Sequence, residues 1–223
     1  MTSVITVDGP SGVGKGTISE YLSDKLKWNY LNSGALYRSI AWVAINESIE
    51  LNDTVGLDNA SKNILFTLHD KKLLIEYKRK SIGSLIYNEE VAKTASKVAS
   101  NPKVRRSIVN IQRQFKKEPG LVAEGRDMGS VIFPESELKI FLTASIETRA
   151  GRRYKQLKDR EFNVSLPALI KDLDARDDRD KSRENSPLVI PTGAFVIETD
   201  DLTIIDLKKI VKEKVNKTYG TNI

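Results

Sequence analysis

Apolar residues along the chain fall into five short runs, separated by longer stretches of helical periodicity. The short runs, which we expect to be core strands, are residues 4–8, 30–31, 121–124, 138–142 and 195–198. Apolar positions recur at helical spacing in residues 15–26, 33–46, 90–115, 146–157, 165–180 and 205–219. Such alternation predicts an α/β fold whose parallel sheet is covered by helices on both faces. Ligands are then expected at the carboxyl ends of the strands.

Residues 63–87 break this rhythm. Three short apolar runs, with a polar turn between the first two, read as antiparallel strands: 64–68, 73–77 and 80–82. We therefore expect a small antiparallel β insertion at 63–87. It would interrupt a core domain made of residues 1–62 and 88–223.

A glycine-rich segment follows the first predicted strand and leads directly into the first predicted helix. Its residues are Gly9, Pro10, Ser11, Gly12, Val13, Gly14, Lys15, Gly16 and Thr17. Strand, glycine-rich turn and helix together are typical of a phosphate-binding loop. Glycines let consecutive backbone N–H groups face phosphate oxygens, and the helix N-terminus adds partial positive charge. Lys15 contributes a full charge, so the segment predicts a nucleotide phosphate site.

The residue after the lysine narrows the class of enzyme. Gly16 stands there, and the first hydroxyl comes one position later, at Thr17. GTPases and most ATPase motors need a hydroxyl directly after the lysine to bind Mg²⁺, so this pattern argues against them. Gly-Lys-Gly-Thr resembles the loop of nucleoside monophosphate kinases, in which Mg²⁺ is held mainly by phosphates and water.

Composition excludes several kinds of site and classes of protein. The chain has 223 residues, a net charge of +6 and no cysteine, so disulfides and thiolate metal sites are excluded. No apolar run approaches the length of a membrane span, and the first strand begins almost at once, so we expect a cytoplasmic protein without a secretory signal. Many of the arginines lie within short motifs beside Asp, Ser and Gly, and aromatic residues do not interleave with the basic ones. This distribution favours a pocket for small polyanions over a nucleic-acid surface.

Two further motifs lie near predicted helix ends. Ser33 can cap the helix at 33–46, which places Arg38 about a turn and a half further on, where it could face a phosphate. An ordinary capped helix explains the same spacing. Ser96 and Arg105 would face opposite ways on one continuous helix, but Asn101-Pro102 predicts a break that could bring them together. A simple helix–helix junction is the plainer interpretation.

Two charged motifs complete the set of candidates. Arg126-Asp127 lies between two glycines at the carboxyl end of a predicted strand, which suits a binding site or a salt-bridged turn. Helical spacing would put Arg176, Arg179, Asp180 and Arg183 on one stripe. Such a stripe is either a solvated surface or a clamp for phosphates in a transition state.

A third arginine group precedes a polar stretch. Arg149, Arg152 and Arg153 are spaced to share a helix face just before residues 155–165. We expect a lid near residues 153–165 that closes over ATP and excludes water.

Taken together, these segments resemble the bacterial cytidylate kinases. The motifs, which occur in the family's order across most of the chain, are the loop 9–17, Ser33-Gly34-Ala35-Leu36-Tyr37-Arg38, Ala95-Ser96 with Asn101-Pro102-Lys103-Val104-Arg105, Glu124-Gly125-Arg126-Asp127-Met128-Gly129, and Arg176-Asp177-Asp178-Arg179-Asp180 with Arg183. The loop alone specifies only a broad superfamily, whereas the last two motifs are much more specific. A β insertion of this length also resembles the bacterial type more than the shorter UMP/CMP kinases of eukaryotes.

The resemblance implies transfer of the ATP γ-phosphate to CMP or dCMP by a monomer, with Mg²⁺ as cofactor and with no nucleic-acid or membrane partner. It assigns the ATP phosphates to Lys15 and its loop. The acceptor side is assigned to Arg38 and Arg126 for the phosphate, Ser96, Arg105 and Asp127 for the cytosine edge, Asp180 and Arg183 for the pentose, and Ser33 near the nucleotide. Arg176 would stabilise the transferring group, with Arg179 and Arg153.

Small departures from the family and two alternatives remain at this stage. Asn32 stands where an acidic residue is common, Ser130 where Thr is usual, and residues 85–87 lack a frequent arginine. One alternative is a kinase for another small acceptor, such as UMP or AMP. The other is a non-catalytic P-loop module that binds nucleotides or nucleic acid. The presence of Lys15 together with Arg126 and Arg176 disfavours this second alternative.

Overall fold

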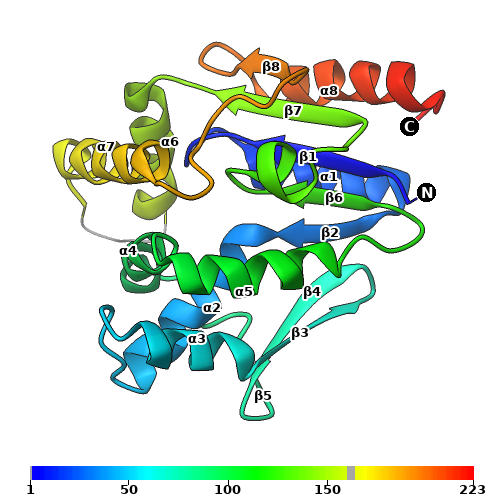
Figure 1. Cartoon of the computed structure of the whole chain (residues 1–223). Helices are drawn as coiled ribbons and strands as arrows, with labels where there is room; N and C mark the ends of the chain where they lie inside the picture. Colours follow the sequence, from blue (N-terminus) through cyan, green and yellow to red (C-terminus); the bar gives the residue numbers. More distant parts are fainter. Residues whose placement is uncertain (1, 160–163) are drawn as a thin grey trace.

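The computed structural model describes residues 2–159 and 164–223, which form a parallel sheet between layers of helices (Figure 1). The five strands of this sheet, in spatial order, are β2 (Asn29–Asn32), β6 (Leu121–Glu124), β1 (Val4–Asp8), β7 (Leu138–Thr143) and β8 (Phe195–Glu198). β1 is central, with Val4 beside Leu121 and Ile5 beside Leu138. All of β1 is buried, which explains its continuous apolar run.

Each face of the sheet has its own apolar core. Ile5 and Val7 pack toward α1 (Lys15–Leu26) and α8 (Ile204–Tyr219). Val4, on the opposite face, belongs to a second core with the helices α2 (Ser33–Asn46), α4 (Glu89–Val98) and α5 (Pro102–Arg113). This alternation of side chains along one strand produces the predicted helix–sheet–helix layers.

The break in strand–helix rhythm corresponds to a second sheet. Its antiparallel strands are β3 (Ile64–His69), β4 (Lys72–Tyr77) and β5 (Lys80–Ser81), paired in that order. Ile64 and Ile75 are buried in the same core as α2, so this sheet packs directly on the helices. The expected antiparallel β insertion is therefore present, while the division of the chain into two domains stays a prediction.

One helix was not predicted from the sequence, whereas the predicted break in another helical region is confirmed. α3 (Thr54–Lys62) was not predicted; it begins where Asp53 Oδ1 accepts the N–H groups of Val55 and Gly56. The helical stretch expected over 90–115, with its predicted break at Asn101-Pro102, consists of α4 followed by α5. Asn101 caps α5, and Pro102 takes its first position, as the predicted break requires.

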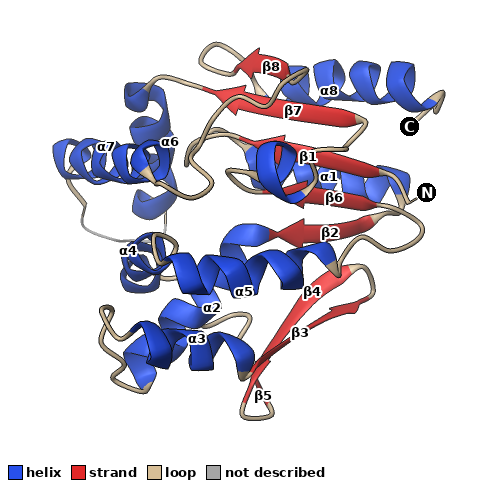
Figure 2. Ribbon diagram, in the orientation of Figure 1, coloured by secondary structure: helices blue, strands red, loops and turns tan. Residues whose placement is uncertain are grey.

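The strands point their carboxyl ends toward α4, α6 (Ile146–Lys158) and α7 (Leu166–Ser182), as Figure 2 shows. The glycine-rich loop leaves β1 at this edge. Beside it, β6 leads into a short π-helical turn, η1 (Met128–Ile132). The motifs that follow these two neighbouring strands are therefore brought together. In residues 2–159 and 164–223, no helix is both long and apolar enough to cross a membrane.

Candidate functional site

The loop after β1 has backbone conformations that favour glycine. Gly12 and Gly14 have φ values of +85° and +94°, and Gly14 directly precedes α1. At Gly9, whose φ is +142°, a Cβ would lie 2.1 Å from the Leu142 carbonyl oxygen of β7. The glycines are therefore required both by backbone angle and by the close approach of a neighbouring strand. This turn sets the start of α1 against the carboxyl edge of the sheet.

Lys15, the first residue of α1, lies almost fully buried beneath the loop. Its ammonium donates a hydrogen bond to the Pro10 carbonyl oxygen at 2.6 Å. Burial lowers the pKa of Lys15, and the charges of Arg126 and Arg176 lower it further. A desolvated cation next to other cations is poised to bind an anion, because a ligand phosphate would relieve both costs.

Glu124, at the end of β6, borders the same loop. The Tyr30 hydroxyl donates to Glu124 Oε1 at 2.6 Å. Burial raises the pKa of Glu124, and Lys15 opposes that rise. Oε1 is 3.6 Å from where a Cβ on Gly16 would lie. The phosphate loop is thus flanked by a buried carboxylate, whose Tyr30 partner was not identified from the sequence.

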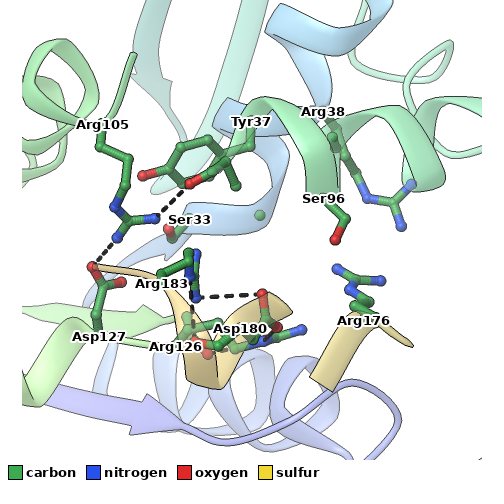
Figure 3. Close-up of a pocket in the computed structure, with 14 residues that line it drawn as sticks. Ser33, Tyr37, Arg38, Ser96, Arg105, Arg126, Asp127, Arg176, Asp180 and Arg183 are labelled. Atoms are coloured by element: carbon green, nitrogen blue, oxygen red, sulfur yellow. Dashed lines mark hydrogen bonds and ion pairs between the residues drawn. The ribbon is translucent and has the colours of Figure 1, made fainter. Parts of the chain in front are cut away.

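One pocket contains all of the residues assigned to the acceptor nucleotide. It is lined by Ser33, Arg38, Ser96, Arg105, Arg126, Asp127, Asp180 and Arg183, with Tyr37 and Arg176 beside them. They come from α2, α4, α5, the turn after β6 and α7 (Figure 3). Four motifs that are far apart in the sequence therefore converge on one space.

A buried ion pair forms one side of this pocket. The Arg105 guanidinium donates to Asp127 Oδ2, and both side chains are less than 5% exposed. Arg105 also donates to the Ala99 carbonyl oxygen at 3.2 Å, which fixes its orientation. Burial raises the pKa of Asp127, while the Arg105 charge opposes the rise. The break at Asn101-Pro102 does place Ser96 and Arg105 on one pocket.

A second ionic group joins α7 to the turn after β6. Arg126 Nε donates to Asp180 Oδ2 at 2.8 Å, and Arg183 lies 3.3 Å from the other oxygen. Burial alone would raise the pKa of Asp180, but Arg126 and Arg183 outweigh it and hold that pKa below its usual range. Asp180 therefore remains a carboxylate that orients two arginines.

Arginines predominate on the side of the pocket nearest the loop. Burial, together with the charges of Arg126 and Arg38, lowers the pKa of Arg176 to about 10. Arg176 Nη1 donates to Ser11 Oγ at 3.4 Å, which connects α7 to the phosphate loop. In Figure 3, Arg38 and Arg176 lie on the opposite side of the view from Arg105 and Asp127. A cluster of cations next to the loop suits phosphate groups, whose charge it would balance.

Several buried polar atoms in the pocket have no hydrogen-bond partner within the described residues. They include the Tyr37 hydroxyl, Ser96 Oγ, Arg105 Nε and Arg176 Nε. Burial raises the pKa of Tyr37 to about 12, so its hydroxyl keeps its proton and can donate. Buried polar groups are normally satisfied, so these atoms indicate places where a ligand completes the site.

Ser33 differs from its sequence-based role. Asn32, not Ser33, caps α2, because its Oδ1 accepts the Ala35 N–H at 3.1 Å. Ser33 instead lies in the first turn, where its Oγ accepts from Gln112 Nε2 at 2.7 Å. Gln112 is fully buried and was not identified from the sequence, since it lies on α5, far along the chain.

The three arginines predicted to share a face of α6 have different partners. Arg149 forms a buried ion pair with Asp177 at 2.7 Å and donates to the Ser11 carbonyl oxygen. Arg152 donates to Thr199, and Arg153 forms an ion pair with Glu89 of α4. The three side chains diverge because each reaches a different neighbouring element.

The predictions for Arg179 and for a lid near residues 153–165 can be compared with the structure only in part. Arg179 donates to the Ala175 carbonyl oxygen of its own helix and does not line the pocket formed by the described residues. Of the lid expected near residues 153–165, residues 160–163 lie outside the described part of the chain. Within residues 2–159 and 164–223, no group of three or more His, Cys, Asp or Glu is arranged to hold a metal ion.

Comparisons with known proteins agree with this geometry. The family model for cytidylate kinase matches residues 5–217. A cytidylate kinase of Aeromonas salmonicida (strain A449) is 42% identical over 99% of this chain and 96% of its own length. That of Shewanella sediminis (strain HAW-EB3) is 44% identical, covering 93% of this chain and 92% of its own. A solved structure of an uncharacterized protein from Eubacterium ventriosum ATCC 27560 aligns with a TM-score of 0.54 at 10% identity, over 97% of this chain and 99% of that one, and supports the fold alone.

Proposed function

The chain belongs to the cytidylate kinase family, and from that premise we propose that it transfers the γ-phosphate of ATP to CMP or dCMP. The observation that carries the proposal is one pocket with two chemically distinct sides. The buried Arg105–Asp127 pair forms one side, and the arginines nearest the phosphate loop form the other. A nucleoside monophosphate has the same division between its base and its phosphate.

The acceptor nucleotide is held by side chains from both sides of this pocket. Asp127 accepts from the exocyclic amine of cytosine, while Arg105 and Ser96 donate to its ring acceptors. Arg38 and Arg126 bind the phosphate. Asp180 and Arg183 contact the pentose, and Ser33 lies close to the nucleotide.

The donor nucleotide is held by the loop from Gly9 to Thr17. Backbone N–H groups and Lys15 bind the ATP phosphates at the start of α1. Arg153 is assigned to the same nucleotide, which requires it to exchange its ion pair with Glu89 for a phosphate. We assign this exchange to the closing step that follows ATP binding.

Catalysis in this arrangement is alignment plus charge. The phosphate oxygen of CMP is already a nucleophile, so no general base is needed. Arg176 lies between the loop and the pocket, where it can follow negative charge that spreads in the transition state. Arg179 is assigned a supporting role, and from its present position outside the pocket it would have to reorient to fulfil it.

Mg²⁺ is assigned to the ATP phosphates and water. The residues fit such an ion, because the Glu124 carboxylate borders the loop beside Gly16 and can contact metal-bound water. When bound, the ion neutralises phosphate charge and helps to orient the transferring group. We also propose that the protein acts as a monomer, as the resemblance to its family implies.

Two other functions fit parts of the site less well. A UMP kinase would place a uracil carbonyl opposite the Asp127 carboxylate, where both groups are acceptors. A non-catalytic nucleotide-binding or nucleic-acid-binding module would have no use for Arg126, Arg176 and Asp180 around one pocket.

A coupled assay of ADP formation with CMP, dCMP, UMP and AMP at equal concentrations tests the proposal. We expect CMP and dCMP to be used at least about tenfold better than UMP or AMP, because mismatched buried polar groups discriminate strongly. Equal use of UMP would contradict the assignment of the base-binding side. Absence of ADP formation with every acceptor would contradict the kinase assignment itself.

A further inference from the structure

We propose that Asp8 is a positioning residue for base recognition, because its carboxylate holds the turn that carries Arg126 and Asp127. The inference rests on the proposed function and extends it to a residue that contacts neither nucleotide. Asp8 is the last residue of β1 and stands directly before the phosphate loop. The phosphate loop of the donor site follows Asp8 in the chain, and the turn of the acceptor site lies against its side chain in space.

Both oxygens of the Asp8 carboxylate accept hydrogen bonds from this turn. Oδ1 accepts the Met128 N–H at 2.9 Å, and Oδ2 accepts the Gly129 N–H at 2.7 Å. These are the first two N–H groups of η1, which begins immediately after Asp127. The side chain of Asp8 is completely buried, so water does not compete for either bond.

The bonds from Asp8 leave Asp127 available for recognition. An aspartate directly before a helical turn usually caps it with its own carboxylate. Asp127 makes no such bond and instead pairs with Arg105. Asp8, from a distant segment, supplies the missing cap. Without it, the orphaned N–H groups would draw the Asp127 carboxylate back to its own backbone.

The turn is fitted closely against β1. A Cβ on Gly129 would lie 2.7 Å from Thr6 Oγ1. The Gly125 N–H donates to the Val7 carbonyl oxygen at 3.1 Å. Such close contacts leave little freedom to absorb a shift, so a change at Asp8 would displace Arg126 and Asp127 together.

Charge also sets Asp8 apart from the rest of the strand. Burial raises the pKa of Asp8 to about 7, although the Met128 and Gly129 N–H groups favour its charged form. Asp127 adds to the rise, and Lys15 opposes it. A buried carboxylate is costly in a core strand, where an apolar side chain would pack without that cost. The two hydrogen bonds that the carboxylate accepts from the turn carrying Arg126 and Asp127 explain why an aspartate stands here.

The test is Asp8→Asn, which keeps the shape but turns an amide NH₂ toward one of the two N–H donors. We expect the KM for CMP to rise at least about tenfold and the preference for CMP over UMP to fall by a similar factor. The KM for ATP should change by less than about twofold, because Asp8 does not reach the phosphates in this assignment.

Ser136→Ala is the matched control. Ser136 Oγ is buried and donates at 2.7 Å to the carbonyl oxygen of Val4, at the other end of β1. This variant loses a buried hydrogen bond on the same strand but leaves the turn intact. We expect it to leave the CMP-to-UMP preference unchanged, whatever it does to stability.

A second variant disturbs the same turn without changing Asp8. Gly129→Ala pushes a methyl group toward Thr6 and should shift the same parameters in the same direction, even if Asp8→Asn does not fold. An unchanged CMP-to-UMP preference in folded Asp8→Asn, or in Gly129→Ala when that is the folded variant, overturns the inference. A wild-type protein without CMP preference would instead contradict the proposed function.

Discussion

The phosphate loop and the acceptor pocket bind similar groups by different means. The loop is one continuous segment, residues 9–17, shaped by glycine backbone angles around a single lysine. The pocket is assembled from residues between 33 and 183, and its charges are held by other side chains. Lys15 donates its hydrogen bond to a loop carbonyl oxygen, whereas Arg105 and Arg126 each pair with a carboxylate.

This difference predicts whether removal of a charge lowers catalytic activity alone or lowers the stability of the fold as well. Removal of the loop charge should cost catalysis and leave the fold intact, because Lys15 donates its hydrogen bond to a neutral carbonyl oxygen and is in no ion pair found among the described residues. Removal of a pocket charge should cost stability as well, because its buried partner is left alone. The difference between the loop and the pocket can be measured with variants of each.

The largest effect is expected at Asp127. Asp127→Ala leaves the Arg105 guanidinium buried without its partner, which should lower the free energy of unfolding by about 3–5 kcal/mol. Urea denaturation at neutral pH measures this loss. The double variant Arg105→Met/Asp127→Leu should recover most of the stability but not the activity with CMP. Full stability in the single variant would show that the pair does not hold the pocket.

Lys15 should behave in the opposite way. Lys15→Met removes the charge aimed at the ATP phosphates, and turnover should fall by about 10²–10³-fold. The free energy of unfolding should stay equal or rise, because burial already lowers the pKa of this ammonium in the folded protein. Steady-state kinetics and urea denaturation of one preparation test both statements. Near-normal turnover would remove the basis for the phosphate-loop assignment.

Arg176 and Arg126 divide the pocket into transition-state and ground-state binding. Arg176→Ala should lower the turnover number by about 10–100-fold while changing the KM for CMP less. Arg126→Ala should raise the KM for CMP as well, since its partner is the bound phosphate. Kinetics with CMP varied at saturating ATP separate the two parameters. Unchanged kinetics in both variants would mean that these arginines only stabilise the fold.

The smallest effect is expected where charges are exposed. Lys93 of α4 and Asp172 of α7 form an ion pair at 2.8 Å, with 62% and 52% of their side chains exposed. Asp172→Asn should lower the unfolding free energy by less than about 1 kcal/mol, an effect that added salt removes. Denaturation at low and high salt tests this. A large loss of unfolding free energy that persists in high salt would show that the burial of an ion pair does not determine its contribution to stability in this protein.

The sequence predicted best what is local. The loop, the central strands and the break at Asn101-Pro102 follow from neighbouring residues, and the structure confirms them. α3 was missed because its apolar positions are few, although Asp53 provides a capping signal. The roles assigned to individual pocket residues stay predictions.

The residues that were missed act through distant partners. Asp8 reads as the end of an apolar strand, and its hydrogen-bond donors lie at 128 and 129. Gln112 contacts Ser33 across two helices. The α6 arginines share a spacing that suggests one face, yet their directions depend on Asp177, Thr199 and Glu89. Spacing along one helix cannot supply such information, because the partners belong to other elements.

The Arg105–Asp127 pair also bears on how this protein can evolve. A substitution of Asp127 that would admit uracil strands Arg105 in the interior, and a substitution of Arg105 strands Asp127. Each single step toward a new base therefore passes through a less stable intermediate, and only a paired change avoids it. Base choice in this lineage should drift slowly, and a switch of base should require stabilising mutations elsewhere to come first.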